Sequence, residues 1–375
     1  MNVSYQLYIS LQNDDCIKQY EMDPNTGALS LRGEVEAWGG PGHLALNPAG
    51  NTVYVGYRGR GDGLHTGGDG TPKKEFGFGG FAIDPRSGNL KLINRVGMHG
   101  EPSYLRTDVR GRFLLSSYFQ AGGCTTHKLD AAGAIGEECI EWWPTNSGAH
   151  SIHVDPSNRY VFVPHIALGN GGLTRLPPDR QTPANAIFQF RFDQETGKLT
   201  ANDPPRVGPP KGNHLGPRHA CFHPTQPWLY VCNEQLSSIT LYTLNRDTGT
   251  LTMGKTITNL PPEADLSKKT SCGDIQMHKN GRFLYAPNRG HNTIATYVVD
   301  QTTGSLTSTG WFRADARPRA FMLDPTGHFL YCAGFETGRL TAYRIDQQNG
   351  TLTELESYQA GHVPMGVVIA KTPGA

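Results

Sequence analysis

One unit occurs seven times along the 375 residues of this chain, and this repeat constrains the fold more than any other feature. Each unit has an apolar stretch, a turn, and a second turn that reads Asp-x-x-Thr/Ser-Gly-x-Leu. The copies of the second turn lie at Asp23 to Leu29, Asp84 to Leu90, Asp193 to Leu199, Asp247 to Leu251, Asp300 to Leu306 and Asp346 to Leu352, with a degenerate copy at Asp130 to Ile135. Successive glycines of these turns are 45 to 64 residues apart. A repeat of roughly 40–50 residues with several strands per unit is typical of β-propellers.

A second recurring element, a β-hairpin, precedes each of these turns. It consists of an alternating apolar run, a four-residue turn with Pro, Gly or Asn, and an aromatic-rich run. The hairpins lie at 43–56, 103–116, 151–164, 220–233, 275–288 and 320–333. The next run, such as 239–245, supplies a third strand, and the segment after the glycine, such as 251–257, supplies a fourth. The sequence therefore predicts an all-β, seven-bladed β-propeller with four antiparallel strands per blade, as one domain over residues 1–375.

The seventh hairpin is divided between the two ends of the chain. Residues 366–370 read as a first strand, Tyr5 to Ser10 as the second and Ile17 to Glu21 as the third. The N-terminal strands would complete a blade that the C-terminus begins, which removes two open sheet edges.

Composition and charge limit the partners of such a protein. The 34 Lys+Arg against 33 Asp+Glu leave no basic excess, so we expect no nucleic-acid partner. No run approaches 18 consecutive apolar residues, and residues 1–10 have neither the basic start nor the apolar core of a signal peptide, so we expect no membrane association. The seven cysteines form no Cys-x-x-Cys motif and read as reduced thiols. We therefore expect a cytoplasmic protein that is a monomer or a small homo-oligomer.

Polar residues gather where the propeller geometry brings strand ends together. The first strand of each blade runs beside the channel and the second returns antiparallel to it. The residues before the first strand and after the second therefore share one rim. The candidates at this rim are His43, Arg58, Tyr118, His150, His165, Arg218, His219, Glu234, Asp274, Arg289 and Arg319.

Two insertions follow second strands at this rim, at 59–80 and 167–185. They account for the two longest gaps in the repeat. Because connections there lie over the same mouth, they are candidate lids, although they could also be surface decoration.

Arg218 and Glu234 form the most specific pair of candidates. Arg218 follows Gly216 and Pro217, and a guanidinium at a channel mouth suits capture of a carboxylate or phosphate. Glu234 ends the partner strand of the same hairpin and should lie beside it. A carboxylate near arginines stays ionised, so it could activate water or hold a substrate hydroxyl. A plain Arg–Glu pair that closes the ring fits the spacing equally well.

Two histidines and one aspartate have separate interpretations. His150, at the start of its strand, is the better acid or base, whereas His153 points to the opposite face and reads as a satisfied histidine between blades. Asp274 could bind substrate between Arg289 and Arg319 or only cap the backbone. Because the rim has only two well-placed carboxylates, we expect no metal, and no motif calls for a cofactor. The chain has no Gly-x-Ser-x-Gly and no cysteine with a catalytic neighbour, which argues against a covalent hydrolase.

Five segments resemble the bacterial 6-phosphogluconolactonase family of seven-bladed propellers, which also contains the fungal carboxy-cis,cis-muconate lactonizing enzyme. They are AHSIHVDPSNRYVFVP, HLGPRHACFHPTQPWLYVCNEQLSSI, CGDIQMHKNGRFLYAPNR, RPRAFMLDPTGHFLYCAG and VPMGVVI. The resemblance covers nearly the whole chain. In the fungal branch a His, two Arg and a Glu are the proposed catalytic group, which the matching motifs assign here to His150, Arg218, Glu234 and Arg289. The two insertions depart from the bacterial pattern.

The resemblance implies a metal-independent lactonase of carbohydrate metabolism, in the pentose phosphate pathway, that acts on 6-phospho-D-glucono-1,5-lactone. Glu234 or His150 would take the proton, while Arg218 and Arg289 would face the oxyanion or the anionic group of the substrate. The alternative enzyme is a cycloisomerase that closes a lactone on a carboxylated diene. A propeller that serves only as a protein-binding scaffold is the non-enzymatic alternative.

Overall fold

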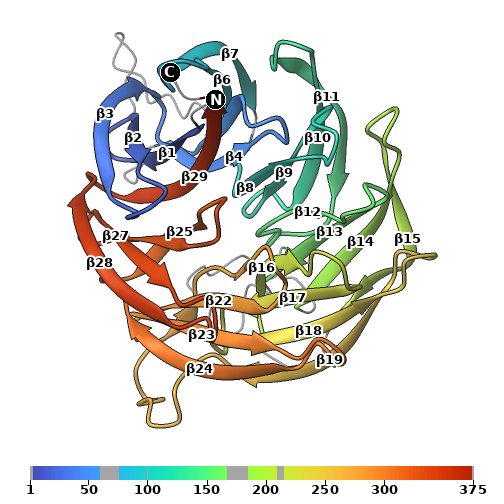
Figure 1. Cartoon of the computed structure of the whole chain (residues 1–375). Helices are drawn as coiled ribbons and strands as arrows, with labels where there is room; N and C mark the ends of the chain where they lie inside the picture. Colours follow the sequence, from blue (N-terminus) through green and yellow to red (C-terminus); the bar gives the residue numbers. More distant parts are fainter. Residues whose placement is uncertain (1–2, 60–75, 99, 167–184, 209–214, 374–375) are drawn as a thin grey trace.

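The computed structural model describes residues 3–59, 76–98, 100–166, 185–208 and 215–373. In these residues the chain forms seven sheets arranged around a central axis (Figure 1). Each sheet has four antiparallel strands, and in one sheet the inner strand is divided into two pieces. The predicted seven-bladed β-propeller is confirmed. The described part of the chain contains no helix that could cross a membrane.

We number the blades 1 to 7 in chain order and give their strands from the channel outward. Blade 1 consists of β4 (Pro41–Leu46), β5 (Thr52–Tyr57), β6 (Phe76–Ile83) and β7 (Leu90–Met98). Blade 2 consists of β8 (Tyr104–Thr107), β9 (Phe113–Tyr118), β10 (Gly123–Leu129) and β11 (Ile135–Pro144). Blade 3 consists of β12 (His153–Val154), β13 (Tyr160–His165), β14 (Ala186–Phe192) and β15 (Leu199–Val207). Blade 4 consists of β16 (Pro217–Phe222), β17 (Trp228–Asn233), β18 (Ser238–Leu244) and β19 (Leu251–Thr258). Blade 5 has the divided inner strand, with β20 (Ser271–Cys272) and β21 (Gln276–Met277) before β22 (Phe283–Arg289), β23 (Thr293–Val299) and β24 (Leu306–Arg313). Blade 6 consists of β25 (Pro318–Leu323), β26 (Phe329–Gly334), β27 (Arg339–Ile345) and β28 (Leu352–Gln359).

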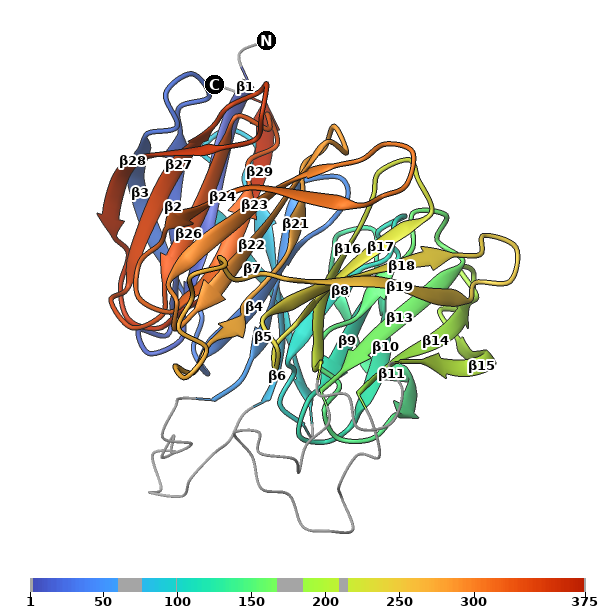
Figure 2. The ribbon, with the colours of Figure 1, turned by 90° about the horizontal axis from the view of Figure 1, so that it is seen from below.

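Blade 7 joins the two ends of the chain. Its inner strand β29 (Pro364–Pro373) pairs with β1 (Val3–Leu11), and β2 (Cys16–Met22) and β3 (Leu29–Glu36) follow outward. The β29–β1 register runs from Val3 opposite Pro373 to Leu11 opposite Pro364. Seen after a turn of 90°, β1 and β29 lie side by side (Figure 2). The predicted division of the seventh hairpin is confirmed, and the ring is closed by main-chain hydrogen bonds.

The hydrophobic core lies between blades. Seven clusters of buried apolar residues fill the spaces between neighbouring sheets, one for each of the seven contacts around the ring. Because side chains alternate along a strand, the second strand of a blade can pack on both neighbouring blades, and the second strands β5 and β17 are buried at every position. Each blade is therefore held by two others.

The repeated turn is built in the same way in every blade. Its seven glycines all have φ between 73° and 87°, a conformation that glycine adopts without a steric cost. In most copies the leading aspartate accepts backbone N–H bonds two and three residues on, as Asp23 does from Asn25 and Thr26. In blade 4 this position belongs to Asn245, which accepts from Asp247 and Thr248, so the copy begins two residues earlier than Asp247.

The glycines of these turns also connect blades. In four places a buried tyrosine on the second strand of one blade donates its hydroxyl proton to the glycine carbonyl oxygen of the next blade, at 2.6 to 3.0 Å. The pairs are Tyr8–Gly88, Tyr54–Gly133, Tyr230–Gly304 and Tyr331–Gly27. The last of these links blade 6 to blade 7, where the ring closes.

Tyr331→Phe is expected to lower the free energy of unfolding by about 1 kcal/mol, because one buried hydrogen bond is lost and the Gly27 carbonyl keeps no replacement. Tyr285→Phe is the matched control, since Tyr285 holds the equivalent place in β22 and its buried hydroxyl has no partner among the described residues. Urea unfolding of both variants checks this expectation. Equal losses of stability would contradict it.

The two predicted insertions lie mostly outside the described residues. Of the segment 59–80, residues 60–75 are not described, and residues 76–80 belong to β6 rather than to a loop. Of the segment 167–185, only Asn185 is described, directly before β14. Their role as lids stays a prediction.

Candidate active site

Two arginines reach the channel mouth from bulges in inner strands. In blade 4 the pairing with β17 shifts between Pro217 and His219, so Arg218 is an extra residue without a partner in the ladder. In blade 6 the same shift leaves Arg319 as the extra residue between Pro318 and Ala320. A bulge redirects the side chain of the extra residue, and a proline is tolerated at the first position of an edge strand. The Pro-Arg sequence of both strands therefore aims a guanidinium at the mouth.

Asp274 and His150 lie where inner strands are interrupted. Asp274 is in the gap between β20 and β21, and its Oδ1 accepts the backbone N–H of Ile275 at 2.8 Å. His150 stands between the isolated bridge of Ala149 with His165 and the short strand β12. Because no regular ladder continues through these positions, both side chains can turn toward the channel.

The central cavity has a volume of about 640 Å³ and is lined by the inner strands. Seven of the predicted residues line it: His43, Arg58, His150, Arg218, His219, Asp274 and Arg319. Tyr104 and Arg106 line it as well, although they are not among the predicted residues. Both lie on β8 two residues apart, so the alternation of that inner strand would have indicated them.

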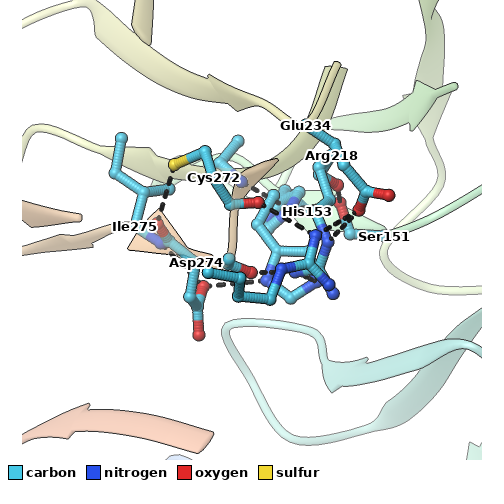
Figure 3. Close-up of polar contacts among 11 residues, drawn as sticks. Ser151, His153, Arg218, Glu234, Cys272, Asp274 and Ile275 are labelled. Atoms are coloured by element: carbon cyan, nitrogen blue, oxygen red, sulfur yellow. Dashed lines mark hydrogen bonds and ion pairs between the residues drawn. The ribbon is translucent and has the colours of Figure 1, made fainter. Parts of the chain in front are cut away.

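Glu234 and Arg289 lie directly behind Arg218. Arg218 donates from Nε to Oε2 of Glu234 at 2.7 Å, and Arg289 donates from Nη2 to the same oxygen at 2.7 Å. Figure 3 shows Glu234 beside Arg218 at one side of the polar network. Burial alone would raise the pKa of Glu234, but Arg289 and Arg218 outweigh it and lower this pKa to about 2. Glu234 is thus ionised and committed to two arginines.

These bonds engage part of each guanidinium. Arg218 also donates from Nη1 to Nε2 of His219 at 3.0 Å and to the Gly273 carbonyl oxygen. Arg289 donates from Nη2 to the Cys272 carbonyl oxygen at 3.2 Å. Among the described residues, Nη2 of Arg218 and Nη1 of Arg289 have no acceptor. Arg218 lines the cavity and Arg289 does not, so the unused Nη2 of Arg218 is the donor that suits an oxyanion or a carboxylate.

Neutral imidazoles surround this pair. Burial, followed by Arg218, holds the pKa of His150 well below its ordinary value, and burial lowers the pKa of His43 to about 3. The His43 ring lies on Tyr104 with 3.8 Å between centroids, and His150 lies 5.1 Å from His219. Neither ring nitrogen of His150 has a hydrogen-bond partner among the described residues, and Nδ1 is buried. His150 is therefore a neutral side chain with an unused lone pair.

His219 and Asp274 form a second polar pair beside Arg218. Nδ1 of His219 is 2.8 Å from Oδ1 of Asp274. Burial raises the pKa of Asp274 to about 6, although Ile275 N–H and Arg218 oppose this shift. Both ring nitrogens of His219 are thus engaged with protein groups.

Arg58 and Arg319 also line the cavity, and they differ in whether a carboxylate neutralises their positive charge. Arg58 forms a salt bridge with Glu101 and donates from Nε at 2.7 Å. Arg319 lies over the ring of Phe335, with 5.4 Å from its guanidinium carbon to the ring centroid. It has no carboxylate partner among the described residues. Burial, followed by Arg58, lowers the pKa of Arg319, as expected for a positive charge without a counter-charge.

The structure does not bring Tyr118 and His165 to the cavity. Tyr118 is buried between blades, where its hydroxyl is 3.0 Å from Oγ1 of Thr125. His165 is also buried, with Nε2 2.8 Å from Oγ1 of Thr145. Both are the last residues of second strands, whereas Arg58 and Glu234 come one residue after such strands. Since side chains alternate, this difference of one residue sends Tyr118 and His165 into the space between blades.

His153 has the place that the sequence analysis gave it. Its Nε2 is 2.8 Å from Oγ of Ser151 and 3.2 Å from the backbone N–H of Ala220 in the next blade. It lies between blades as predicted, but its Nδ1 is buried and has no hydrogen-bond partner among the described residues, so the prediction that it is fully satisfied is wrong. Within the described ranges, no three His, Cys, Asp or Glu side chains gather in a way that could hold a metal ion.

Comparison with known families and sequences gives a consistent picture. The family model described as "Lactonase, 7-bladed beta-propeller" matches residues 6–369. A 6-phosphogluconolactonase of Enterobacter sp. (strain 638) is 28% identical over 298 residues, which cover 80% of this chain and 78% of that protein. A 6-phosphogluconolactonase of Pectobacterium atrosepticum is 29% identical over 300 residues, covering 80% of this chain and 79% of the relative.

Solved structures share the fold at lower identity. The periplasmic gluconolactonase of Pseudomonas aeruginosa superposes with a TM-score of 0.82 at 22% identity, over 99% of this chain and all of that one. A protein from Lactobacillus plantarum gives a TM-score of 0.80 at 21% identity, over 98% of this chain and 99% of that one. At such identities the likeness concerns the fold.

Proposed function

The chain belongs to the family of lactonases that fold as seven-bladed β-propellers, and from this premise we propose that it hydrolyses the lactone of a sugar acid. The substrate that we propose is 6-phospho-D-glucono-1,5-lactone, whose hydrolysis gives 6-phosphogluconate. The names of the curated relatives support this choice. A cytoplasmic location is part of the proposal and is supported by seven free cysteines, five of them buried.

The observation that carries the proposal is the excess of positive charge at the mouth. Arg218 and Arg289 share the single carboxylate of Glu234, and Arg58 pairs with Glu101. Arg319 adds a fourth guanidinium with no carboxylate among the described residues. Such an excess favours an anionic substrate, and the unused Nη2 of Arg218 favours a second, developing negative charge.

The arrangement supports a direct attack of water on the lactone carbonyl carbon. His150, neutral and without a partner, would take a proton from the attacking water. Arg218 would receive the oxyanion that forms as the carbonyl π bond opens, and Arg289, behind it, would add positive charge through their shared partner Glu234. When the carbonyl re-forms, the bond from this carbon to the ring oxygen breaks, and the ring oxygen takes the proton to become a hydroxyl. The products are the hydroxyl and the carboxyl group of the open acid, the water supplies all added atoms, and the carboxyl group then releases its proton to solvent.

A panel of lactones with and without a phosphate tests the proposal, with acid release followed by pH-stat and the spontaneous rate subtracted. We expect the highest kcat/KM for the phosphorylated six-membered lactone. Turnover of no lactone above the spontaneous rate would overturn the proposal. A fall in diene absorbance on addition of carboxymuconate would instead favour the cycloisomerase.

Arg319→Ala is expected to raise KM for the phosphorylated lactone about 10- to 100-fold and to change KM for the unphosphorylated lactone much less. This range corresponds to the loss of one charge-assisted contact to the phosphate. Initial rates at varied substrate concentration give both constants. Arg317→Ala is the control, because Arg317 also lies over Phe335 but is half-exposed and near Glu336. Equal changes for both lactones would exclude Arg319 from the phosphate contact.

A further inference from the structure

The bulge in β16 places two consecutive side chains in one network. In a regular strand Arg218 and His219 would point to opposite faces. Because the ladder shifts between Pro217 and His219, the guanidinium of Arg218 instead reaches back to the His219 ring, with 3.0 Å between Nη1 and Nε2. Both side chains are almost fully buried, at 2% and 7% exposure. Figure 3 shows Arg218 together with Glu234 and Asp274 in this network.

The donors and acceptors of this network fix the tautomer of His219. A guanidinium only donates hydrogen bonds, so Nε2 of His219 must accept from Arg218 and cannot carry a proton. The proton of the neutral ring therefore lies on Nδ1, which donates to Oδ1 of Asp274 at 2.8 Å. The same oxygen accepts the Ile275 backbone N–H, which holds the carboxylate in place.

Three of the contacts of Arg218 determine where its remaining donor points. Nε is held by Glu234, and Nη1 is held by His219 and by the Gly273 carbonyl oxygen. The guanidinium is planar and rigid, so these contacts leave no freedom for the direction of Nη2. Without the His219 acceptor, Nη1 would keep only the Gly273 carbonyl oxygen, so one of the three contacts that fix the direction of Nη2 would be missing.

We propose that His219 is a positioning residue, which Asp274 holds in the Nδ1–H tautomer so that Nε2 orients the guanidinium of Arg218 toward the substrate. This inference rests on the proposed function for the role of Arg218. It assigns His219 no contact with the substrate, because both of its nitrogens are already engaged. It differs from the prediction that His219 and Asp274 bind the lactone themselves.

Paired substitutions separate positioning from substrate contact. His219→Phe keeps a ring against Tyr104 and His150 but removes the acceptor, and we expect kcat/KM to fall on the order of 10²-fold, as for a misplaced catalytic group. His219→Gln can offer its side-chain oxygen near the place of Nε2 and should recover a large part of this loss. His328→Phe is the control, since His328 is exposed and far along the chain in a turn. Equal losses for the Phe and Gln variants would overturn the proposal.

Asp274 offers a second pair of variants. Asp274→Asn keeps an oxygen toward Nδ1, because the Ile275 N–H still selects an acceptor at that position, so its activity should exceed that of Asp274→Ala. A loss in the Asn variant as large as in the Ala variant would mean that the charge of Asp274, and not its acceptor, is needed.

Long-range ¹⁵N–¹H spectra of the histidine rings test the tautomer without any substrate. We expect a protonated Nδ1 and an unprotonated Nε2 for His219 in the wild type, with loss of this state in Asp274→Ala. A protonated Nε2 would overturn the proposal whether or not a lactone is turned over. Failure of the lactone panel with the expected tautomer would count against the proposed function alone.

Discussion

Arg218→Ala is expected to lower kcat/KM for the lactone by on the order of 10²- to 10³-fold, or about 3–4 kcal/mol of transition-state stabilisation. The variant loses the Nη2 donor at the place where the oxyanion forms. It also leaves Glu234 with Arg289 as its remaining arginine partner among the described residues and leaves Nε2 of His219 without a donor. Initial rates by pH-stat measure this loss, and thermal unfolding confirms that the variant is folded.

The matched control for this prediction is Arg282→Ala, which removes an exposed arginine that lies over Phe283 outside the site. Arg218→Lys separates charge from geometry. A lysine keeps the positive charge but cannot contact Glu234, His219 and the oxyanion from one rigid plane, so most of the loss should remain. Wild-type kinetics in Arg218→Ala would remove this residue from the mechanism.

The fold could be predicted because the residues of one short turn recur in every blade and indicate the repeat. Each blade carries its own Asp-x-x-Thr-Gly signal, and a glycine at positive φ with an Asx-type cap is a local property that needs no tertiary information. The division of blade 7 followed from counting, since one hairpin was missing between the ends. Asn245 is not among the predicted turn residues, because the pattern requires an aspartate, whereas here the carboxamide oxygen of an asparagine accepts the backbone N–H.

The site could be predicted less completely, for reasons of side-chain direction. Sequence position placed Arg218, Glu234 and Asp274 at one mouth, since strand ends follow from the hairpins. The same argument picked Tyr118 and His165, because the exact last residue of a strand decides which face it presents. The contact between Arg218 and His219 depends on a bulge, and their contact with Asp274 depends on a gap in the inner strand of another blade. Only the Pro-Arg dipeptide shared by β16 and β25 marks the bulge in the sequence, and the gap in blade 5 has no such mark.

His150→Phe is expected to lower kcat about 10²- to 10⁴-fold with little change in KM, because it removes the proton acceptor and keeps a ring against Phe119 and His219. Single-turnover rates, after subtraction of the spontaneous reaction, measure the loss. A variant with unchanged kcat would exclude His150 as the base.

Comparison with Glu234→Gln decides between the two proton acceptors that the sequence left open. Glu234 has a pKa of about 2, so it is a weak base, and its Oε2 is already held by both Arg218 and Arg289. Its replacement should act through the arginines and change KM together with kcat. His150 has no such partners, so its replacement should change kcat alone. The assignment would be reversed if Glu234→Gln lost only kcat and His150→Phe remained active. The reason is that only the group that holds the proton in the transition state affects the chemical step by itself.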